Sequence, residues 1–359
     1  MSTSKLRVLI VEDSAVVREH LRRIIDADPR LEVAAMAASG EEALAIVDSV
    51  APDVISMDIH LPGIEGLETT RRIMAQRPTP IVVVSGIARQ DVNLSMEALK
   101  AGALSVVDKP VSSGHEDYAA MGSRLCTQLA IMSEVKVIRR REPSGLSSWQ
   151  PVPPASPQKP NKVPAGAVKY GLLAVAASTG GPNALVRLLN GLGTDFPLPI
   201  AIVQHMSPGF MDGFADWLNS TTPFACCVVH ERVEMKRGCA YVAPSGLHLV
   251  CRGIWADVED GPPSGSHKPS ANVLFGSVAR GGIPAIGVLL TGMGDDGAQG
   301  MAELHRSTVG TYTIAEDAST AVVYGMPAAA AKLGAVRESL PLESIAPRIL
   351  ELVKSGKGA

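Results

Sequence analysis

Residues 171–189 have the sequence GLLAVAASTGGPNALVRLL, and this stretch decides the fold of the second half of the chain. An unbroken apolar run, a glycine-rich turn and then helical periodicity are typical of a strand–turn–helix unit in a parallel sheet. Pro182 suits the first helical position, where its missing N–H would have no partner. Ser178 is therefore expected at the carboxyl end of a strand, where open α/β sheets bind ligands. A phosphate-binding turn or a helix cap is the alternative, because S-T-G-G alone is a weak signal.

The composition predicts an ordinary globular protein of about two domains. The chain has 359 residues, 46% of them hydrophobic and 19% charged, and a formal net charge of −3. This slightly acidic balance argues against general affinity for nucleic acid. Five cysteines without a C-x-x-C pattern predict reduced thiols in a cytoplasmic protein, not disulfides or a zinc site. No apolar stretch reaches the ~18 residues of a spanning helix, so no membrane insertion is expected.

Residues 1–138 are predicted to form a first α/β domain. The expected strands are 6–12, 31–36, 53–57, 80–85 and 103–107, and the expected helices are 14–26, 40–49, 64–76, 91–101 and 116–138. Five such units predict a doubly wound, flavodoxin-like parallel sheet. Residues 139–168 contain seven prolines and are predicted to be an extended linker. A second doubly wound parallel-sheet domain is expected over 169–359.

Polar residues follow the strands of the first domain. The first strand ends in Glu12 and Asp13, the third in Asp58 and the fourth in Ser85, and Lys109 follows the fifth. Right-handed crossovers bring these ends to one edge of the sheet. Clustered carboxylates need a cation, and oxygen ligands suit Mg²⁺. The metal, the lysine and the hydroxyl would orient a phosphoryl group, with Asp58 as a carboxylate nucleophile.

The second domain repeats the alternation of strands and helices. After the strand at 172–177 we expect strands at 199–204, 224–230, 284–291 and 309–315, a hairpin at 239–251, and helices within 266–280, after 297 and at 327–333. Ser178, His205 and Asp296 each lie at or just beyond the carboxyl end of a predicted parallel strand. An imidazole that takes the serine proton, oriented by a carboxylate, makes the hydroxyl a nucleophile.

Several choices within this site remain open from position alone. Asp295 is adjacent to Asp296 and competes with it as the orienting carboxylate. A metal site from these two aspartates and histidines is a further interpretation, as is a dinucleotide site at Gly180-Gly181, which lacks the G-x-G-x-x-G spacing. The other histidines of the domain are His230, His248, His267 and His305. The glycine-rich loop supplies Met293 as a candidate backbone donor to an oxyanion.

The first domain resembles response-regulator receiver domains over about residues 5–125. The motifs that carry the resemblance are VEDS at 11–14, SMDIHLPGIEG at 56–66, VVVSG at 82–86 and VDKP at 107–110. The resemblance implies that a histidine kinase phosphorylates Asp58 and that Ser85 and Lys109 contact the phosphoryl group. Receivers often have an aromatic switch residue three positions before the lysine, and Val106 stands there. The usual aromatic switch is therefore not expected.

The same resemblance implies a magnesium site in the receiver. Mg²⁺ would be held by Asp13, Asp58 and the backbone carbonyl of His60, with Glu12 in support. It would serve phosphorylation only.

The second domain resembles the chemotaxis protein-glutamate methylesterases of the CheB family over about 169–350. The motifs are AASTGG, VQHMSPGF, YVAPSGLHL, DGPPSGSHKPSANVLF, LLTGMGDDGAQGM and VYGMP. The resemblance implies that Ser178 is the nucleophile, His205 the general base and Asp296 the orienting carboxylate, with Thr179 in the active site. It implies hydrolysis of γ-glutamyl methyl esters on chemoreceptors with release of methanol, deamidation of glutamines in some members, and no cofactor for hydrolysis.

The resemblance also implies that the unphosphorylated receiver covers the active site. Ala176 and Asn272 depart from the family pattern, which often has glycine and aspartate there, but neither removes a member of the triad. The alternatives are a receiver-controlled serine esterase with another substrate and a non-enzymatic binding module. A transcription factor ranks last, because no helix-turn-helix pattern follows the linker.

Overall fold

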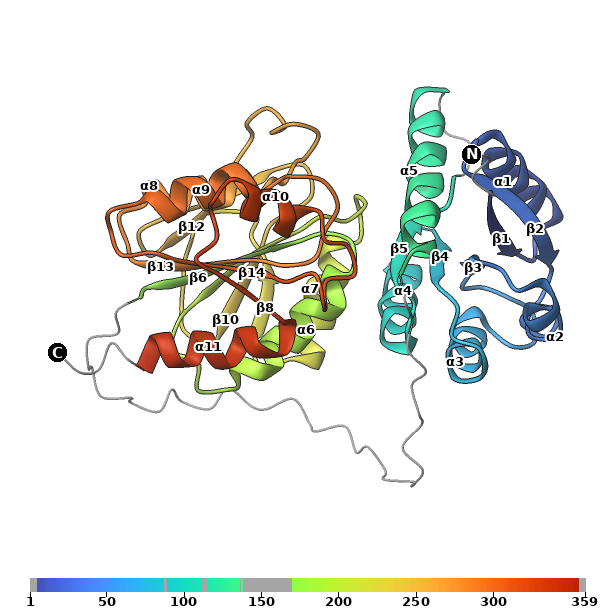
Figure 1. Cartoon of the computed structure of the whole chain (residues 1–359), viewed down its shortest axis with the longest axis horizontal. Helices are drawn as coiled ribbons and strands as arrows, with labels where there is room; N and C mark the ends of the chain where they lie inside the picture. Colours follow the sequence, from blue (N-terminus) through green and yellow to red (C-terminus); the bar gives the residue numbers. More distant parts are fainter. Residues whose placement is uncertain (1–4, 87–88, 111–114, 136, 138–169, 355–359) are drawn as a thin grey trace, which may run out of the picture.

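The computed structural model describes residues 5–86, 89–110, 115–135, 137 and 170–354, which form two α/β units (Figure 1). The first has a parallel five-stranded sheet in the order β2-β1-β3-β4-β5. Its strands are β1 (Leu6–Val11), β2 (Leu31–Ala37), β3 (Val54–Asp58), β4 (Ile81–Ser85) and β5 (Ser105–Asp108). This is the flavodoxin-like order that was predicted. The linker predicted at 139–168 lies outside the described residues.

Helices cover both faces of this sheet. They are α1 (Ala15–Ala27), α2 (Gly40–Val50), α3 (Gly66–Gln76), α4 (Arg89–Ala101) and α5 (His115–Ser133). Ser14 and Ser39 cap α1 and α2, because each hydroxyl accepts a backbone N–H from the first turn. Successive residues of a strand face opposite sides, so β1 buries Val8 against the core under α1 and α5 and Leu9 against the core under α2 to α4.

The second unit is organised around β6 (Leu172–Ala177). Its main sheet has the order β15-β14-β13-β6-β7-β10-β8, and all neighbouring strands are parallel. The other strands are β7 (Ile200–Gln204), β8 (Ala225–Val228), β10 (Cys239–Val242), β13 (Ala285–Leu289), β14 (Tyr312–Glu316) and β15 (Glu338–Leu340). Along the chain, the strands after β6 are added to the sheet on the side of β7, and those after β13 on the side of β14. This change of direction creates a crevice at the carboxyl ends of β6 and β13.

Helices also cover both faces of the second sheet (Figure 1). One face carries α6 (Gly181–Leu192), α7 (Met211–Thr221) and α11 (Leu342–Lys354), and the other α8 (Ala271–Arg280), α9 (Ala298–Arg306) and α10 (Met326–Lys332). Every residue of β6 is fully buried between them. A strand buried on both faces needs apolar side chains on both, which explains the unbroken run 172–177.

The hairpin predicted at 239–251 is wrong. β10 is instead a parallel strand of the main sheet, between β7 and β8. The chain leaves the sheet at a turn through Gly246, which has φ +77°. It then enters a separate three-stranded sheet made of β9 (Val233–Glu234), β11 (His248–Arg252) and β12 (Trp255–Glu259). Two apolar runs about a turn look the same in sequence whether they pair with each other or with other strands.

The first unit packs against the second through helices. Helices α4 and α7 pack together, and α4 also contacts α6 (Figure 1). Val322 and Val323, in the loop after β14, pack against the core beneath α1 and α5. Across the described residues, no helix combines the length and apolarity that crossing a membrane requires.

Candidate active site

Ser178 directly follows β6, and its backbone is held on three sides. Its N–H donates to the carbonyl of Thr291 over 3.0 Å. Its own carbonyl accepts the N–H of Gly181 over 2.9 Å and the side-chain Nε2 of Gln204 over 2.7 Å. Gly180 has φ +79°, which turns the chain into α6. The strand end and the helix start therefore fix the position of the hydroxyl.

His205 comes from the end of the neighbouring strand, β7. Its backbone N–H donates to the carbonyl of Ala177 over 3.0 Å. Nε2 of the ring lies 2.9 Å from Oδ2 of Asp296, but neither ring nitrogen has an aligned hydrogen-bond partner among the residues described. Because Asp296 occupies the Nε2 edge, Nδ1 is the nitrogen left to face a serine proton. Such contacts often tighten only when substrate binds.

Asp296 is buried at the N-terminus of α8. Its carboxylate accepts the Ser270 hydroxyl over 2.7 Å and the backbone N–H groups of Ala271 and Asn272 over 2.6 and 3.1 Å. Burial acts to raise the pKa of Asp296, but His205, Ser270 and Ala271 outweigh it and lower this pKa to about 2. The carboxylate stays charged, as an orienting group must. Asp296 therefore lies beside His205, whereas its neighbour Asp295 is exposed.

The loop after β13 passes directly beside the serine. A Cβ atom on Gly292 would lie 2.8 Å from Cβ of Ser178, so only glycine fits there. The Thr291 hydroxyl donates to the carbonyl of Thr179 over 2.9 Å, which links the two loops. Thr179 is buried, whereas Met293 is partly exposed and lines the same cavity as Ser178. The predicted oxyanion donor is thus brought to the site by this loop.

Three buried or half-buried polar side chains around the site were not predicted to act there. Gln204 donates from one amide nitrogen to the carbonyls of both Ser178 and His205. Glu316 accepts the N–H of Thr291 over 2.8 Å, and burial raises the pKa of its carboxyl. His267 stacks on His205. A glutamine ending an otherwise apolar strand was a signal for Gln204, whereas nothing in the sequence brings position 267 next to 205.

The competing interpretations of these loops lose support. His248 accepts the N–H of Ser270 at Nδ1 over 3.2 Å, and its Nε2 lies 3.0 Å from the carbonyl of Pro262. Its ring is therefore fully used in holding the start of α8. In the part of the chain that is described, three metal-ligating side chains approach within 4.8 Å of one another only in the receiver. The metal site suggested for Asp295 and Asp296 is not formed.

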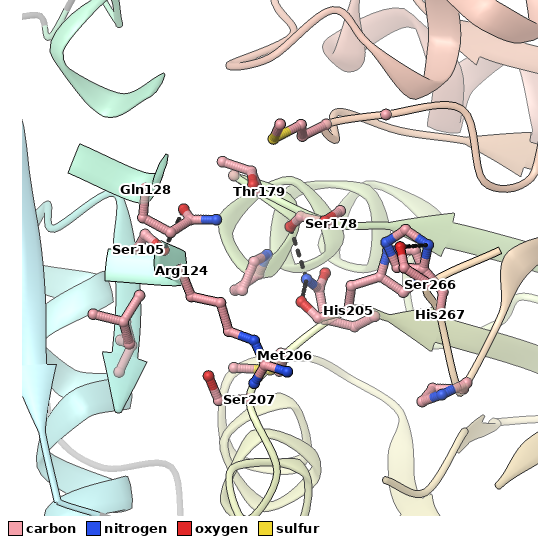
Figure 2. A pocket seen from close by; sticks show the side chains of 18 of the residues that line it. Ser105, Arg124, Gln128, Ser178, Thr179, His205, Met206, Ser207, Ser266 and His267 are labelled. Atoms are coloured by element: carbon pink, nitrogen blue, oxygen red, sulfur yellow. Dashed lines mark hydrogen bonds between the residues drawn. The ribbon is translucent and has the colours of Figure 1, made fainter. Parts of the chain in front are cut away.

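Ser178 and His205 line a cavity of about 610 Å³ between the two units. Figure 2 shows Thr179, Ser178 and His205 on one side and Gln128 and Arg124 of α5 on the other. The receiver therefore forms a wall of the cavity that contains the serine.

The predicted phosphoacceptor lies in an acidic cluster. Nζ of Lys109 is 2.7 Å from Oε2 of Glu12 and 2.9 Å from Oδ2 of Asp58. Oxygens of Glu12, Asp13 and Asp58 approach within 4.8 Å of one another. Burial raises the pKa of Glu12, Lys109 opposes this and Asp58 reinforces it. Carboxylates of this number and spacing fit a hard divalent cation such as Mg²⁺.

The other predicted receiver residues lie near this cluster. Ser85 is buried at the end of β4, and its hydroxyl donates to the carbonyl of Gly86 over 3.3 Å. The backbone N–H of Lys109 donates to the Ser85 carbonyl over 2.8 Å. His60 is exposed two residues after Asp58.

A side-chain contact joins the phosphoacceptor region to the serine site. Asp108 directly precedes Lys109, and Ser207 follows His205 by two residues. Burial raises the pKa of the Asp108 carboxyl, and the nearby Ser207 hydroxyl opposes this rise. The contact spans the two units.

Comparison with known proteins gives matches to both units. Residues 173–349 match the CheB methylesterase family, and residues 8–116 match the response regulator receiver domain. The chain is 49% identical over 356 residues to a protein-glutamate methylesterase/protein-glutamine glutaminase of Paramagnetospirillum magneticum, covering 98% of this chain and 99% of that one. It is 40% identical over 362 residues to one of Myxococcus xanthus, with 100% of both covered.

A solved structure is also similar to the second unit. The CheB methylesterase catalytic domain of Thermotoga maritima is 31% identical with a TM-score of 0.47, covering 51% of this chain and 99% of that one.

Proposed function

Because this chain belongs to the family of CheB-type protein-glutamate methylesterases/protein-glutamine glutaminases, we propose that it hydrolyses glutamyl methyl esters and glutamine amides of proteins through Ser178, His205 and Asp296. The chain is a methylesterase regulated by a receiver domain. One observation supports the assignment of the triad most strongly. The 2.9 Å approach of Nε2 of His205 to Asp296 occurs in the cavity that Ser178 lines, at the change of winding in the sheet.

In the first step, Nδ1 of His205 takes the proton of Ser178 as Oγ attacks the carbonyl carbon of the glutamyl side chain. The developing imidazolium is stabilised by Asp296, which stays ionised. Backbone N–H groups, with Met293 as a candidate, would hold the negative charge on the oxygen. As the bond from the carbonyl carbon to the leaving group breaks, His205 gives this proton to the methoxide oxygen, which leaves as methanol, or to the amide nitrogen of a glutamine, which leaves as ammonia. Water, activated by the same histidine, releases the glutamate from Ser178.

In the receiver, Asp58 would accept the phosphoryl group from a histidine kinase. Glu12, Asp13 and Asp58, with the backbone carbonyl of His60, would hold Mg²⁺, and their carboxylate oxygens suit this ion. The bound ion would neutralise charge on the phosphoryl group. Ser85 and Lys109 would contact that group from the ends of β4 and β5. Hydrolysis of the ester itself would need no cofactor.

Regulation would act through the shared cavity. Val106, at the position of the usual aromatic switch, lines this cavity with Arg124 and Gln128. A valine has no large ring to rotate, so we propose that the signal passes along the backbone from Lys109 to Asp108 and its contact with Ser207. Phosphorylation would loosen this contact and admit substrate.

The substrates we propose are methylated glutamates and selected glutamines on chemoreceptors, in the cytoplasm. A helix that carries a γ-glutamyl ester would have to enter the cavity that the receiver now borders. All five cysteines are free thiols, which fits a reducing compartment.

The proposal is tested by methanol release from methylated receptor cytoplasmic fragments. It is measured with and without a small phosphodonor and Mg²⁺, and with Ser178→Ala as the control. Release that depends on Ser178 and rises with the phosphodonor is expected. Release that ignores the phosphodonor would leave the esterase but contradict control by Asp58. No release from several receptors would indicate another ester substrate or a binding role.

A further inference from the structure

His267 lies flat against His205. The ring centroids are 4.2 Å apart and the ring planes differ by 19°, and Figure 2 shows the two rings side by side at the cavity. His267 comes from the turn before α8, while His205 follows β7. A stacked pair from two separate segments needs an explanation beyond local sequence.

The stack restrains a ring that has few other restraints. The backbone of His205 is fixed by its bonds to Ala177 and Gln204. Its two ring nitrogens have no aligned hydrogen bond within the described ranges, and Asp296 meets the ring at a single edge. Rotation of a histidine ring about its Cβ–Cγ bond is soft. A second ring against its face opposes that rotation.

His267 is itself firmly held. Its backbone exchanges hydrogen bonds with Ser264 over 3.1 and 3.2 Å, which closes a tight turn. Its Nδ1 lies 3.5 Å from the Ser266 hydroxyl, at the limit of a hydrogen bond. Lys268, the next residue, is ion-paired with Asp260. The turn can therefore present the ring as a fixed surface.

Burial favours the neutral form of His267. Burial is the main cause that lowers the pKa of His267, and His205 lowers it further, while Asp296 and Asp295 oppose them. Lys268 on the same turn is paired with Asp260, and Arg124 from α5 lines the same cavity. An uncharged ring can stack on an imidazolium, whereas a charged one would repel it.

We propose that His267 is a positioning residue, whose neutral ring holds His205 in orientation and stabilises the positive charge that forms on it during hydrolysis. The inference rests on the proposed role of His205 as the base. The stabilised group is the imidazolium made when Ser178 loses its proton. Attraction between a cation and an aromatic face would lower the activation free energy enough to raise the rate roughly threefold to thirtyfold.

Three substitutions distinguish the contribution of the aromatic face of His267 from those of its ring nitrogens and its packing volume. His267→Phe keeps an aromatic face, His267→Leu keeps apolar volume, and His267→Ala removes both. The turnover number kcat for methanol release is expected to follow the order His and Phe above Leu above Ala, with about a tenfold loss for Ala and KM within about twofold. A melting temperature for each variant separates loss of rate from loss of fold.

A pH series supplies the second readout. Protonation of His267 at low pH places a positive charge beside the forming imidazolium, and phenylalanine cannot protonate. The ratio of the His267→Phe rate to the unsubstituted rate should therefore rise as the pH falls from about 7 to about 5. A merely structural role would leave this ratio constant, and a constant ratio overturns the proposal.

Other outcomes also decide the matter. If His267→Phe is as slow as His267→Ala, the ring nitrogens are required and the stacking proposal is wrong. If all three variants retain the original kcat, His267 does not contribute to hydrolysis and the proposal is wrong. Ser178→Ala and His205→Gln are measured beside them. If Ser178→Ala and His205→Gln hydrolyse the ester at the original rate, the proposed mechanism itself is wrong. If these two variants lose activity while the variants of His267 keep theirs, only this inference is wrong.

Discussion

The side-chain amide of Gln204 hydrogen-bonds the backbone carbonyl of Ser178 over 2.7 Å. The same nitrogen donates to the carbonyl of His205 over 2.9 Å. One fully buried amide thus joins the ends of β6 and β7, the two neighbouring strands that the proposed nucleophile and base follow. The Gln204 side chain therefore helps to set the spacing of Ser178 and His205.

Gln204→Leu should therefore impair both activity and stability. The His205 carbonyl would lose its donor and the Ser178 carbonyl would keep only the N–H of Gly181, which costs roughly 1–3 kcal/mol of unfolding free energy, and kcat should fall about tenfold as the strand ends shift. Asn190→Leu is the matched control, because it removes an amide–carbonyl bond of 3.1 Å at an exposed site on α6. Denaturant unfolding and methanol release are measured for both. Equal kcat in the two variants would contradict the role assigned to Gln204.

Gly292→Ala should displace the nucleophile. The added methyl would lie 2.3 Å from Sδ of Met326 and 2.8 Å from Cβ of Ser178. Overpacking of this kind costs about 1–3 kcal/mol, and we expect a loss of kcat that exceeds the loss of stability. Gly171→Ala, whose methyl would meet its nearest neighbour at 3.7 Å, should be tolerated. Full activity in Gly292→Ala would mean that the loop after β13 can move away freely.

Asp296→Asn should change how stability depends on pH. The pKa of Asp296 is lowered to about 2 from 3.8, so its charged form stabilises the fold at every pH above about 4. That contribution, roughly 2 kcal/mol, is lost as the pH falls from 4 to 2. The difference in unfolding free energy between the unsubstituted protein and Asp296→Asn should therefore shrink over this window. A difference that stays constant would show that the amide replaces the carboxylate fully.

Much of the architecture was predictable because burial leaves a pattern. The unbroken apolar strand 172–177 and the alternation of strands and helices indicated parallel sheets, and both family resemblances are confirmed. The same alternation predicted that Ser178 and His205 each follow the carboxyl end of a parallel strand, where open α/β sheets bind ligands. These predictions depended on local periodicity and on the handedness of crossovers, which are the same in every protein of this class.

The features that the sequence did not predict are set by contacts between distant segments. The pairing of β10 with β7 and β8 depends on the whole sheet, so the turn after it looked like a hairpin. Helix α7, helix α11 and strand β15 were also missed. The choice of Asp296 rests on the N-terminus of α8 meeting its carboxylate, and the stack of His267 on His205 needs the same folded turn. Periodicity carries no information about such meetings.

Ser207→Ala should raise the basal activity of the unphosphorylated protein. The substitution removes the hydroxyl that lies near the Asp108 carboxyl, across the boundary between the two units. A polar interaction of this kind contributes about 1 kcal/mol, so a rise of about twofold to fivefold in methanol release is expected. The phosphodonor should then add less than it does in the unsubstituted protein. An unchanged basal rate would mean that the contact between Asp108 and Ser207 does not transmit control.

Lys109→Met should make the receiver depend on a divalent cation for stability. The lysine ammonium lies within 2.9 Å of carboxylates on both Glu12 and Asp58, which are almost fully buried, so its loss leaves two negative charges unpaired. Breaking a buried pair in this way costs roughly 3–5 kcal/mol. Mg²⁺ should then raise the melting temperature of Lys109→Met more than that of the unsubstituted protein, because the ion would replace the missing charge.

The pH dependence separates this explanation from a simple loss of packing. Burial already raises the pKa of Glu12. Without the lysine, protonation of Glu12 relieves repulsion from Asp58, so the destabilisation of Lys109→Met should be greater at pH 8 than at pH 5. Lys109→Arg, which keeps the charge but not the shape, should lose the response to the phosphodonor while remaining stable without Mg²⁺. If the stability of Lys109→Met depends on neither pH nor Mg²⁺, the fold itself keeps the carboxylates of the cluster far enough apart that they need no cation.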